Sequence, residues 1–253
     1  VWDQRKSGEV FPLLIAITAI RDGKDRVTNY VLSFSDITAA KRDADAIHKL
    51  AFFDPLTHLP NRRALIDRLP QALTSCETDR NTLGLLFVDL DRFKDINDAL
   101  GNQVGDKVLI GTAQRLRSCV GSEDTVARIG GDEFVVVLEN LNLNIEVAKA
   151  EVDEVAANIL VSLNRPYHID NQEVRSAASI GVALADHGQI SIEELFKQAD
   201  IGLYQAKTSG RNQMCFFDPA MEQTATLQAQ LANALNSAVQ DQQFELYYQI
   251  QVD

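Results

Sequence analysis

The sequence predicts a mixed α/β fold, in which helices pack against a central sheet in two or three layers. The segment 82–91 (TLGLLFVDLD) is apolar on both faces, which is typical of a buried strand. A Gly-Gly pair separates two short apolar runs within 125–138, and glycine supplies the positive φ that a tight hairpin needs. Apolar residues recur at helical spacing over 144–163, which predicts a long helix between strands.

The composition is that of an ordinary globular protein with an acidic balance. Lys+Arg is 24 and Asp+Glu is 36, so the net charge of −12 argues against nonspecific nucleic-acid binding, which draws on basic patches. No apolar run approaches the roughly 20 residues of a membrane span, and no signal peptide is visible. The chain begins without methionine, so we expect a fragment of a longer protein. Free thiols and a cytoplasmic location are expected, since no CxxC pair links Cys76, Cys119 and Cys215.

The N-terminal residues predict a strand pair followed by a helix. Strands over 9–20 and 27–36 are joined by a segment with an Asp-Gly hairpin signal. Apolar residues then recur at helical spacing over 37–53, and Asp36 is placed to cap this helix. The helical pattern stops at an Asp-Pro pair, because the residue before proline avoids the α region.

The remaining elements alternate between helix and strand. Ser191 and Glu194, three residues apart, form a capping box at the start of one helix. Asp218-Pro219 opens a further helix, since proline suits the first helical turn. The elements predicted between these ends are a helix from about Asn61, the strand 82–91, a helix over 105–119, the hairpin 125–138, the helix 144–163, strands over 166–170 and 173–184, and a helix over 191–210.

Two acidic clusters lie where strands end or turn. Asp89 and Asp91 are two residues apart, so both point to one face of the strand 82–91. A carboxylate in an apolar strand is costly unless it is paired or binds metal, so we interpret Asp89 as a metal ligand. Asp91 has the alternative role of a helix N-cap. Asp132 and Glu133 follow the Gly-Gly pair directly, where their oxygens suit a hard cation such as Mg²⁺.

Four motifs occur in the order found in the GGDEF family of diguanylate cyclases, and the chain resembles this family over 54–217. RIGGDEFVVVLE (128–139) contains the Gly-Gly-Asp-Glu-Phe motif itself. The resemblance implies a palm-like domain with a central, mostly antiparallel sheet flanked by helices. It also implies that a homodimer condenses two GTP molecules into cyclic di-GMP and pyrophosphate, with two Mg²⁺ or Mn²⁺ ions per active site. The other three motifs are DPLTHLPNRR (54–63), FVDLDRFKDINDALGNQVGD (87–106) and YQAKTSGRN (204–212).

The resemblance also assigns roles to individual residues of these motifs. Asp89 and Asp132 would bind metal, helped by the carbonyl oxygen of Leu90. Asp132 and Glu133 would be the catalytic pair, and Glu133 would either bind metal or deprotonate the attacking hydroxyl. The implied GTP-binding residues are Asn97 and Asp106 for guanine, Phe93, Lys94, Lys207 and Arg211 for the phosphates, and Gly131, which lets the nucleotide approach the hairpin.

Three of the candidate positions have a second interpretation. Asn97 is also typical of a helix or turn cap. Lys207, with Gly210 after it, is also typical of a helix C-terminus. Arg128 either reaches a phosphate or pairs with a nearby acid.

The sequence departs from the family pattern at three places. Asn102 stands where histidine is usual and His58 where glycine is usual, so we expect reduced or altered activity at most. Many members have an Arg-x-x-Asp product-inhibition site upstream of the hairpin. Here Asp124 is present, but Gly121 replaces the arginine that would hold phosphate, which predicts weak or absent product inhibition.

The flanking segments resemble parts of two further domains. Residues 1–36 resemble the C-terminal part of a PAS sensor domain, although an appended hairpin is the alternative, and 37–53 would be a linker helix. Residues 218–240 would be a second linker helix, and 241–253 resemble the start of an EAL phosphodiesterase domain. We expect neither sensing nor phosphodiesterase activity from such partial domains.

Two other hypotheses compete with the interpretation as a diguanylate cyclase. One is a GTP-binding regulatory module with little activity, which controls a downstream EAL domain. The other is a different palm-like nucleotidyl enzyme.

Overall fold

Two compact units make up the chain, residues 1–53 and residues 54–253. The structure is a computed structural model, and it describes residues 1–186, 190–222, 237–239, 243, 245 and 247.

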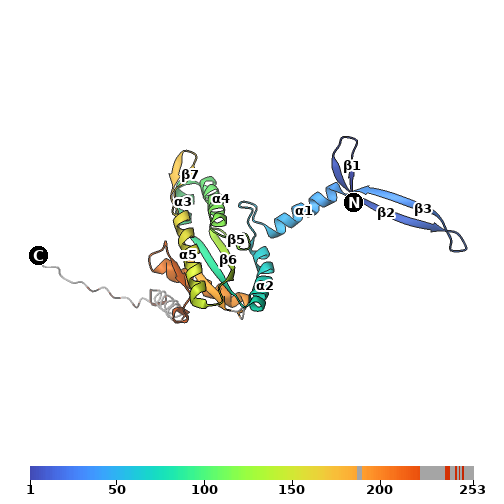
Figure 1. The fold of residues 1–253 in the computed structure, drawn as a ribbon. Helices are drawn as coiled ribbons and strands as arrows, with labels where there is room; N and C mark the ends of the chain where they lie inside the picture. The colour runs from blue at the N-terminus through green and yellow to red at the C-terminus, as the bar shows by residue number, and fades with distance from the viewer. Residues whose placement is uncertain (187–189, 223–236, 240–242, 244, 246, 248–253) are drawn as a thin grey trace. The chain divides into compact units, whose positions relative to one another are not determined.

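A five-stranded sheet forms the centre of the larger unit (Figure 1). Its strand order is β10-β9-β4-β6-β5, in which β10 runs parallel to β9 and the other neighbours are antiparallel. The predicted α/β class with a mostly antiparallel sheet is therefore confirmed. The strands are β4 (Thr82–Asp91), β5 (Thr125–Gly130), β6 (Glu133–Leu141), β9 (Ala177–Asp186) and β10 (Met214–Phe216).

Helices cover both faces of this sheet, which gives three layers. The helices α2 (Arg62–Asp79) and α6 (Ile192–Thr208) pack on one face. The helices α4 (Asn102–Ser118) and α5 (Ile145–Leu163) pack on the other. The predicted helix starts are confirmed for α2 and α6, because Asn61 accepts a hydrogen bond from the backbone N–H of Ala64 and Ser191 accepts one from that of Glu194.

Strand β4 is buried on both faces, as its apolar sequence predicted. Leu85 and Phe87 belong to the core cluster that includes residues of α2 and α6. Leu86 and Val88 alternate with them and belong to the cluster that includes residues of α4 and α5. This central strand therefore carries Asp89 and Asp91 at its end into the middle of the unit.

The structure corrects several predicted boundaries. A short helix, α3 (Phe93–Leu100), follows β4 and was not predicted, and neither was β10. Helix α4 begins at Asn102 rather than at residue 105. The predicted strand over 173–184 is two strands, β8 (Gln172–Val174) and β9.

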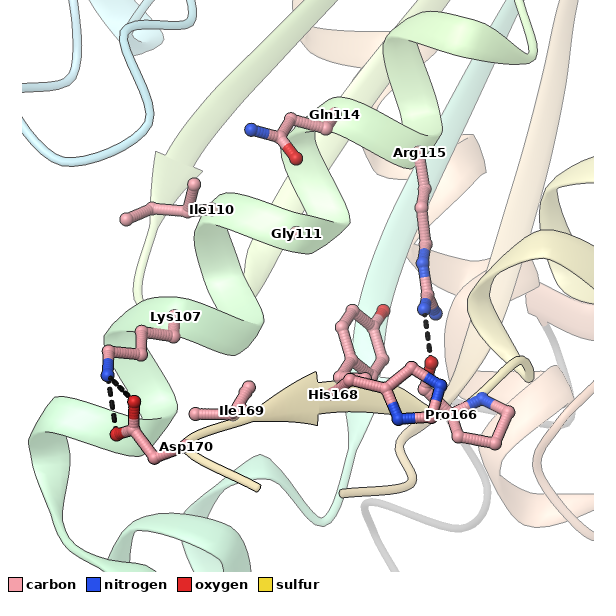
Figure 2. A pocket seen from close by; sticks show the side chains of 10 residues that line it. Lys107, Ile110, Gly111, Gln114, Arg115, Pro166, His168, Ile169 and Asp170 are labelled. Carbon is pink, nitrogen blue, oxygen red and sulfur yellow. Dashed lines mark hydrogen bonds and ion pairs between the residues drawn. The ribbon is translucent and has the colours of Figure 1, made fainter. Parts of the chain in front are cut away.

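Strand β8 pairs with β7 (Tyr167–Ile169) in a separate hairpin that packs on α4 (Figure 2). An added Cβ at Gly111 would lie 2.9 Å from the Tyr167 ring, so the absent side chain makes room for that ring. The Arg115 guanidinium lies 3.6 Å from the centroid of the same ring. A pocket of about 490 Å³ lies between helix and hairpin, closed at one end by an ion pair of 2.5 Å between Lys107 and Asp170.

The smaller unit consists of an antiparallel sheet and one helix. The N-cap position of α1 is Ile37, which has no side-chain capping hydrogen bond, so the prediction that Asp36 occupies the cap is wrong by one residue. Asp36, at the end of β3, accepts a hydrogen bond of 2.9 Å from the backbone N–H of Thr38. Ile15, Ile17 and Phe34 lie on one exposed face of the sheet. The elements are β1 (Trp2–Gln4), β2 (Val10–Arg21), β3 (Val27–Asp36) and α1 (Thr38–Phe52).

Of the predicted helix over 218–240, residues 219–222 and 237–239 are helical, and the rest lies outside the described residues. Nearly all of the segment 241–253 also lies outside them. Within the described part of the chain, none of the helices combines the length and the apolar character that a membrane span requires.

Candidate active site

The two predicted acidic clusters meet at one end of the central sheet. Asp89 on β4 lies opposite Glu133 on β6 in the strand register. Asp132 lies in the turn that precedes β6, and its carbonyl oxygen accepts a hydrogen bond of 3.3 Å from the backbone N–H of Leu90. Residues that are more than forty positions apart in the sequence are thereby brought together.

Asp89 is buried, with 7% of its surface exposed, and it is paired with a lysine. Its Oδ2 lies 2.8 Å from Nζ of Lys207, in the last turn of α6. Burial raises the pKa of Asp89 above its usual value, the Lys207 ammonium opposes this, and the carboxylates of Asp132 and Asp91 add to it. Burial, together with Asp89 and Asp132, also raises the pKa of Glu133.

This cluster has the donor chemistry that a divalent cation needs. Carboxylate oxygens, with the nearby carbonyl of Leu90, are the ligands that Mg²⁺ prefers. The charge on Asp89 is balanced by the Lys207 ammonium, so this position favours a cation. Among the described residues, no three His, Cys, Asp or Glu side chains already converge as a metal site. Asp89, Leu90, Asp132 and Glu133 therefore stay the predicted metal ligands.

The hairpin between β5 and β6 has the predicted glycine turn. Gly131 has a φ of +48° and, with Asp132, forms the turn, whereas Gly130 is the last residue of β5. An added Cβ at Gly131 would meet no atom within 4 Å, so the approach to the hairpin is open. That a ligand comes close to the backbone at Gly131 stays a prediction.

Arg128 pairs with an acid, which decides between its two predicted roles in this structure. Its Nη1 lies 3.0 Å from Oδ2 of Asp54, and its Nη2 donates a hydrogen bond of 2.7 Å to the carbonyl of Gly131. Burial raises the pKa of Asp54, but hydrogen bonds from Thr57 and Arg128 outweigh it, so the pKa lies below its ordinary value. Asp54, which the sequence did not single out, therefore supports the hairpin through Arg128.

Asp91 does not cap a helix, and that alternative is wrong. The N-cap position of α3 is Arg92, which has no side-chain capping hydrogen bond. Oδ1 of Asp91 accepts a hydrogen bond of 2.8 Å from Ser179 on β9, and Oδ2 accepts one of 3.0 Å from the backbone N–H of Asn212. The carboxylate thus joins three segments, because the chain turns into α3 through a left-handed residue instead of presenting Asp91 to the helix.

The predicted guanine-binding residues lie on the adjacent helices α3 and α4. Asn97 has a buried Oδ1 with no hydrogen-bond partner, and Asp106 is exposed in the first turns of α4. An added Cβ at Gly105 would lie 1.9 Å from Oδ1 of Asn97, so this glycine makes the space for the amide. Asn102 is exposed at the first position of α4. A buried acceptor without a partner is costly, and the guanine-binding role of Asn97 and Asp106 stays a prediction.

The predicted phosphate-binding residues fall at helix ends. Phe93 and Lys94 open α3, where backbone N–H groups have no partner inside the helix. Arg211 follows α6 in a left-handed conformation, with φ of +63°, and is exposed. Lys207 contacts Asp89, so its amine faces the acidic cluster rather than only the end of its own helix.

Two of the three departures from the family pattern can be followed in the local structure. His58 has a φ of +57°, a left-handed conformation that suits the glycine usual at this position. Asp124 accepts hydrogen bonds from the backbone N–H groups of Gly121, at 2.8 Å, and Glu139, at 3.1 Å. One oxygen of Asp124 is therefore used within its own turn and the other by strand β6, and weak product inhibition stays a prediction.

The fold and site define a palm-like nucleotide domain, and comparison with known proteins gives the family. A profile described as "Diguanylate cyclase, GGDEF domain" matches residues 51–213. The chain belongs to the GGDEF domain family.

Two curated relatives carry this domain within longer chains. MucR of Pseudomonas aeruginosa, named a bifunctional diguanylate cyclase/cyclic di-GMP phosphodiesterase, is 39% identical over 236 residues, which cover 93% of this chain and 33% of MucR. PdeR of Escherichia coli, named a cyclic di-GMP phosphodiesterase, is 34% identical over 220 residues, which cover 87% of this chain and 32% of PdeR. The chain spans about a third of the length of these relatives.

A solved structure of the GGDEF domain of TpbB from Pseudomonas aeruginosa has the same fold. It superposes with a TM-score of 0.63 and 36% identity, over 69% of this chain and 99% of that structure. The similarity confirms the palm-like architecture.

Proposed function

We propose that this chain is a diguanylate cyclase, which condenses two GTP molecules into cyclic di-GMP and releases pyrophosphate as a homodimer. One observation carries the proposal: the carboxylates of Asp89, Asp132 and Glu133 gather at one sheet end. The neighbouring helix α3 carries Asn97, whose amide oxygen is buried without a hydrogen-bond partner. Adjacent elements thus carry the carboxylates that would bind metal ions beside the phosphates and the amide that would contact the base.

The acidic residues would form the metal-binding side of the reaction centre. Asp89 and Asp132, with the carbonyl of Leu90 and with Glu133, would hold two Mg²⁺ or Mn²⁺ ions. When bound, such ions neutralise phosphate charge and lower the pKa of the attacking hydroxyl. Glu133, whose own pKa is raised by burial and by its acidic neighbours, is suited either to bind metal or to accept that hydroxyl's proton.

The remaining residues would bind and orient GTP. Asn97 and Asp106 would read the guanine edge, because an amide and a carboxylate complement its donors and acceptors. The phosphates would lie across the hairpin at Gly131, with Phe93 and Lys94 contributing helix N–H groups and Lys207 and Arg211 contributing cations. Asn102 and Arg128 would have only secondary roles in GTP binding. Arg128 already supports the hairpin.

Two domains are needed because each holds only one GTP. The 3′-hydroxyl of each nucleotide must reach the α-phosphate of the other, so two sites must face one another. The apolar residues Ile47 and Leu50, which α1 exposes, suit this helix for a role as a linker that holds two copies together. We place the protein in the cytoplasm, where GTP is available.

The direct test is an incubation of this chain with GTP and Mg²⁺, followed by detection of cyclic di-GMP and pyrophosphate. The Glu133→Ala variant serves as the control, and it should lower product formation by several orders of magnitude if the carboxylate acts in the reaction. Absence of product at high protein concentration would reject the cyclase.

A regulatory module is the second candidate, and the relatives favour it specifically. PdeR carries a matching segment but is named for phosphodiesterase activity. In this alternative the domain binds GTP and signals to an EAL domain, whose start would be residues 241–253, under an input from a PAS domain ending at residue 36. It predicts that Asp132→Ala leaves a background level of product unchanged.

A further inference from the structure

The β7–β8 hairpin contacts α4 at the middle of the helix and again near its start (Figure 2). At the base of the hairpin the Tyr167 ring fills the notch at Gly111, and its hydroxyl lies 3.0 Å from Oγ1 of Thr112. At the tip, Nζ of Lys107 lies 2.6 and 2.5 Å from the two carboxylate oxygens of Asp170. The hollow of about 490 Å³ lies between these contacts, so packing alone does not join the tip to the helix.

The turn at the tip of the hairpin presents a carboxylate toward α4. Asp170 and Asn171 both have positive φ values, of +48° and +65°, as in the two-residue turn that fits antiparallel strands best. Aspartate and asparagine adopt this conformation more readily than most residues. Residues 170–173 are exposed, whereas Tyr167 and Ile169 belong to the core. The Asp170 side chain therefore anchors a part of the hairpin that burial does not hold.

The start of α4, which this carboxylate reaches, has weak local support. The N-cap position is Gly101, which has no side chain to cap the helix. The first turn also has no acidic residue, which would be favourable at a helix N-terminus. A helix that begins without these features frays more easily, so contacts from outside the helix decide how firmly its first turns are held.

Three consecutive residues in these first turns have different surroundings. Gly105 lies against Asn97 of α3, because an added Cβ there would be 1.9 Å from Oδ1 of that residue. Asp106 is exposed, and Lys107 reaches the hairpin. Because the backbone of one helical turn moves as a unit, a displacement of Lys107 also displaces Asp106 and Gly105, which lie at the predicted guanine site.

We propose that the β7–β8 hairpin braces the guanine-binding turn of α4, with Lys107 and Asp170 as a pair of positioning residues. The proposal rests on the proposed function, in which Asp106 and Asn97 contact guanine. A carboxylate distinguishes a base only within hydrogen-bond distance of its edge, and a small displacement weakens such a contact steeply. The proposed phosphate ligands lie on other elements, so the pair affects binding of the base and not of the phosphates.

The test measures binding of GTP, ITP and inorganic pyrophosphate to the whole chain in Mg²⁺. Inosine lacks the 2-amino group of guanosine, a donor that a carboxylate such as Asp106 accepts, so the ratio of the GTP and ITP affinities measures that contact. Lys107→Gln and Asp170→Asn each remove the ion pair, and asparagine keeps the left-handed turn. Lys149→Gln on α5 is the matched control. Its ammonium forms an ion pair of 2.8 Å with Glu146, and the side chain of Lys149 is 45% exposed, against 47% for Lys107.

We expect Lys107→Gln and Asp170→Asn each to reduce the preference for GTP over ITP roughly threefold, the effect of one exposed ion pair. Pyrophosphate binding should stay unchanged. The double variant should lose no more than either single one, because both substitutions remove the same contact. Hydrogen exchange of the amides of residues 104–108 should be faster in both variants than in Lys149→Gln, since the first turns of α4 are held less firmly.

The results distinguish this proposal from the cyclase function. If both variants prefer GTP over ITP as strongly as Lys149→Gln does, the positioning role is rejected, even in a chain that makes cyclic di-GMP. If the affinities for all three probes fall equally, the ion pair has only a structural role and the proposal is rejected too. A reduced preference in a chain that makes no cyclic di-GMP would support the positioning pair and reject the cyclase. A wild type that binds GTP and ITP equally tightly would reject the guanine contact of Asp106 and this proposal with it.

Discussion

Two aspartates that are two positions apart, Asp89 and Asp91, have different roles in this domain. They share one face of β4, and no local pattern separates them. Asp89 faces the Lys207 ammonium, whereas Asp91 accepts hydrogen bonds from Ser179 and from the backbone of Asn212. Asp91 is unsuited to bind a metal, because hydrogen bonds within the fold engage both of its oxygens. The charge of Asp89 is balanced by the Lys207 ammonium alone, so a metal ion can take the place of this cation.

This exchange predicts that Lys207→Gln tightens metal binding in the absence of nucleotide. In the wild type a cation must displace the Lys207 ammonium from Asp89, so removing the lysine should raise Mn²⁺ affinity roughly threefold to tenfold, the value of a partly buried pair. GTP affinity should fall in the same variant, because a phosphate ligand is lost. Mn²⁺ titration followed by electron paramagnetic resonance measures the first effect. Lys197→Gln on the same helix is the control, and equal Mn²⁺ affinity in both variants would contradict the exchange.

The raised pKa of Glu133 predicts a stability that depends on pH. A carboxyl group whose pKa is higher in the folded state than its ordinary value of 4.5 binds its proton more tightly when folded. Ionisation of Glu133 therefore lowers the free energy of unfolding. The whole loss is present at a pH above the raised pKa, and none of it at a pH below 4.5. Glu133→Gln removes this unfavourable charge, so it should raise the free energy of unfolding by roughly 0.5–1 kcal/mol at pH 8, the usual size of a single stabilising substitution.

Urea unfolding without divalent ions, from pH 8 downward, measures this difference. The gain from Glu133→Gln should shrink as the pH falls toward 4.5, where both side chains are neutral. Glu154→Gln, at an exposed position on α5, should show no such trend. A gain that is the same at every pH would mean that charge is not its cause.

The backbone at His58 predicts a stabilising glycine. Its φ of +57° costs a residue with a Cβ about 1–2 kcal/mol, and part of this is offset because glycine is more flexible in the unfolded chain. His58→Gly should therefore raise the free energy of unfolding by about 0.5–1 kcal/mol. His58→Ala retains the Cβ and should not, so thermal unfolding of the two variants separates backbone strain from the loss of the imidazole.

At the scale of elements, the position of α6 depends on a glycine in the strand beneath it. An added Cβ at Gly181 would lie 2.0 Å from the carbonyl oxygen of Ala199 and 2.2 Å from the backbone nitrogen of Leu203. Backbone atoms of a packed helix cannot move singly, so α6 lies close to β9 only because this side chain is absent. The same helix carries Lys207 to Asp89.

Gly181→Ala should therefore be among the most damaging single substitutions in the chain. We expect a loss of about 3 kcal/mol or more in the free energy of unfolding, the size of severe overpacking. Gly84→Ala on β4 is the comparison, because its Cβ would meet only side-chain atoms, at 3.1 Å, which can shift. Denaturant unfolding measures both, and an equal effect would show that the helix adapts.

Sequence predicted those elements whose signals are local. Periodicity and a capping side chain suffice for α2 and α6, and burial on both faces suffices for β4. Helix α3 was missed because it has only eight residues and no capping hydrogen bond. Strand β10 has three residues and exists through its pairing with β9, which is a tertiary contact. The convergence of Asp89 with Glu133 followed from the motifs. The contacts that Asp54, Ser179 and Gly105 make with site residues depend on tertiary packing, which the spacing of residues in the sequence does not encode.

At the scale of the whole molecule, the net negative charge of the chain opposes the association of two copies that the proposed function requires. Each chain has a net charge of −12, so two copies repel at long range. The proposed reaction nevertheless requires two copies, each with one GTP. Association must then come from short-range contacts, and salt should favour it, because the screening length falls to about 8 Å at physiological ionic strength.

The need for two copies predicts how activity depends on concentration and on an inactive partner. On dilution, the rate of cyclic di-GMP formation should fall with about the square of protein concentration, and added salt should move the onset of activity to lower concentration. Excess Asp132→Asn chain should suppress the wild type, because a mixed pair has only one complete acidic cluster, whereas the same excess of serum albumin should not. Steady-state rates measured over a dilution series test both effects. A rate that stays proportional to wild-type concentration, and is indifferent to the variant, would mean that one copy completes the reaction alone.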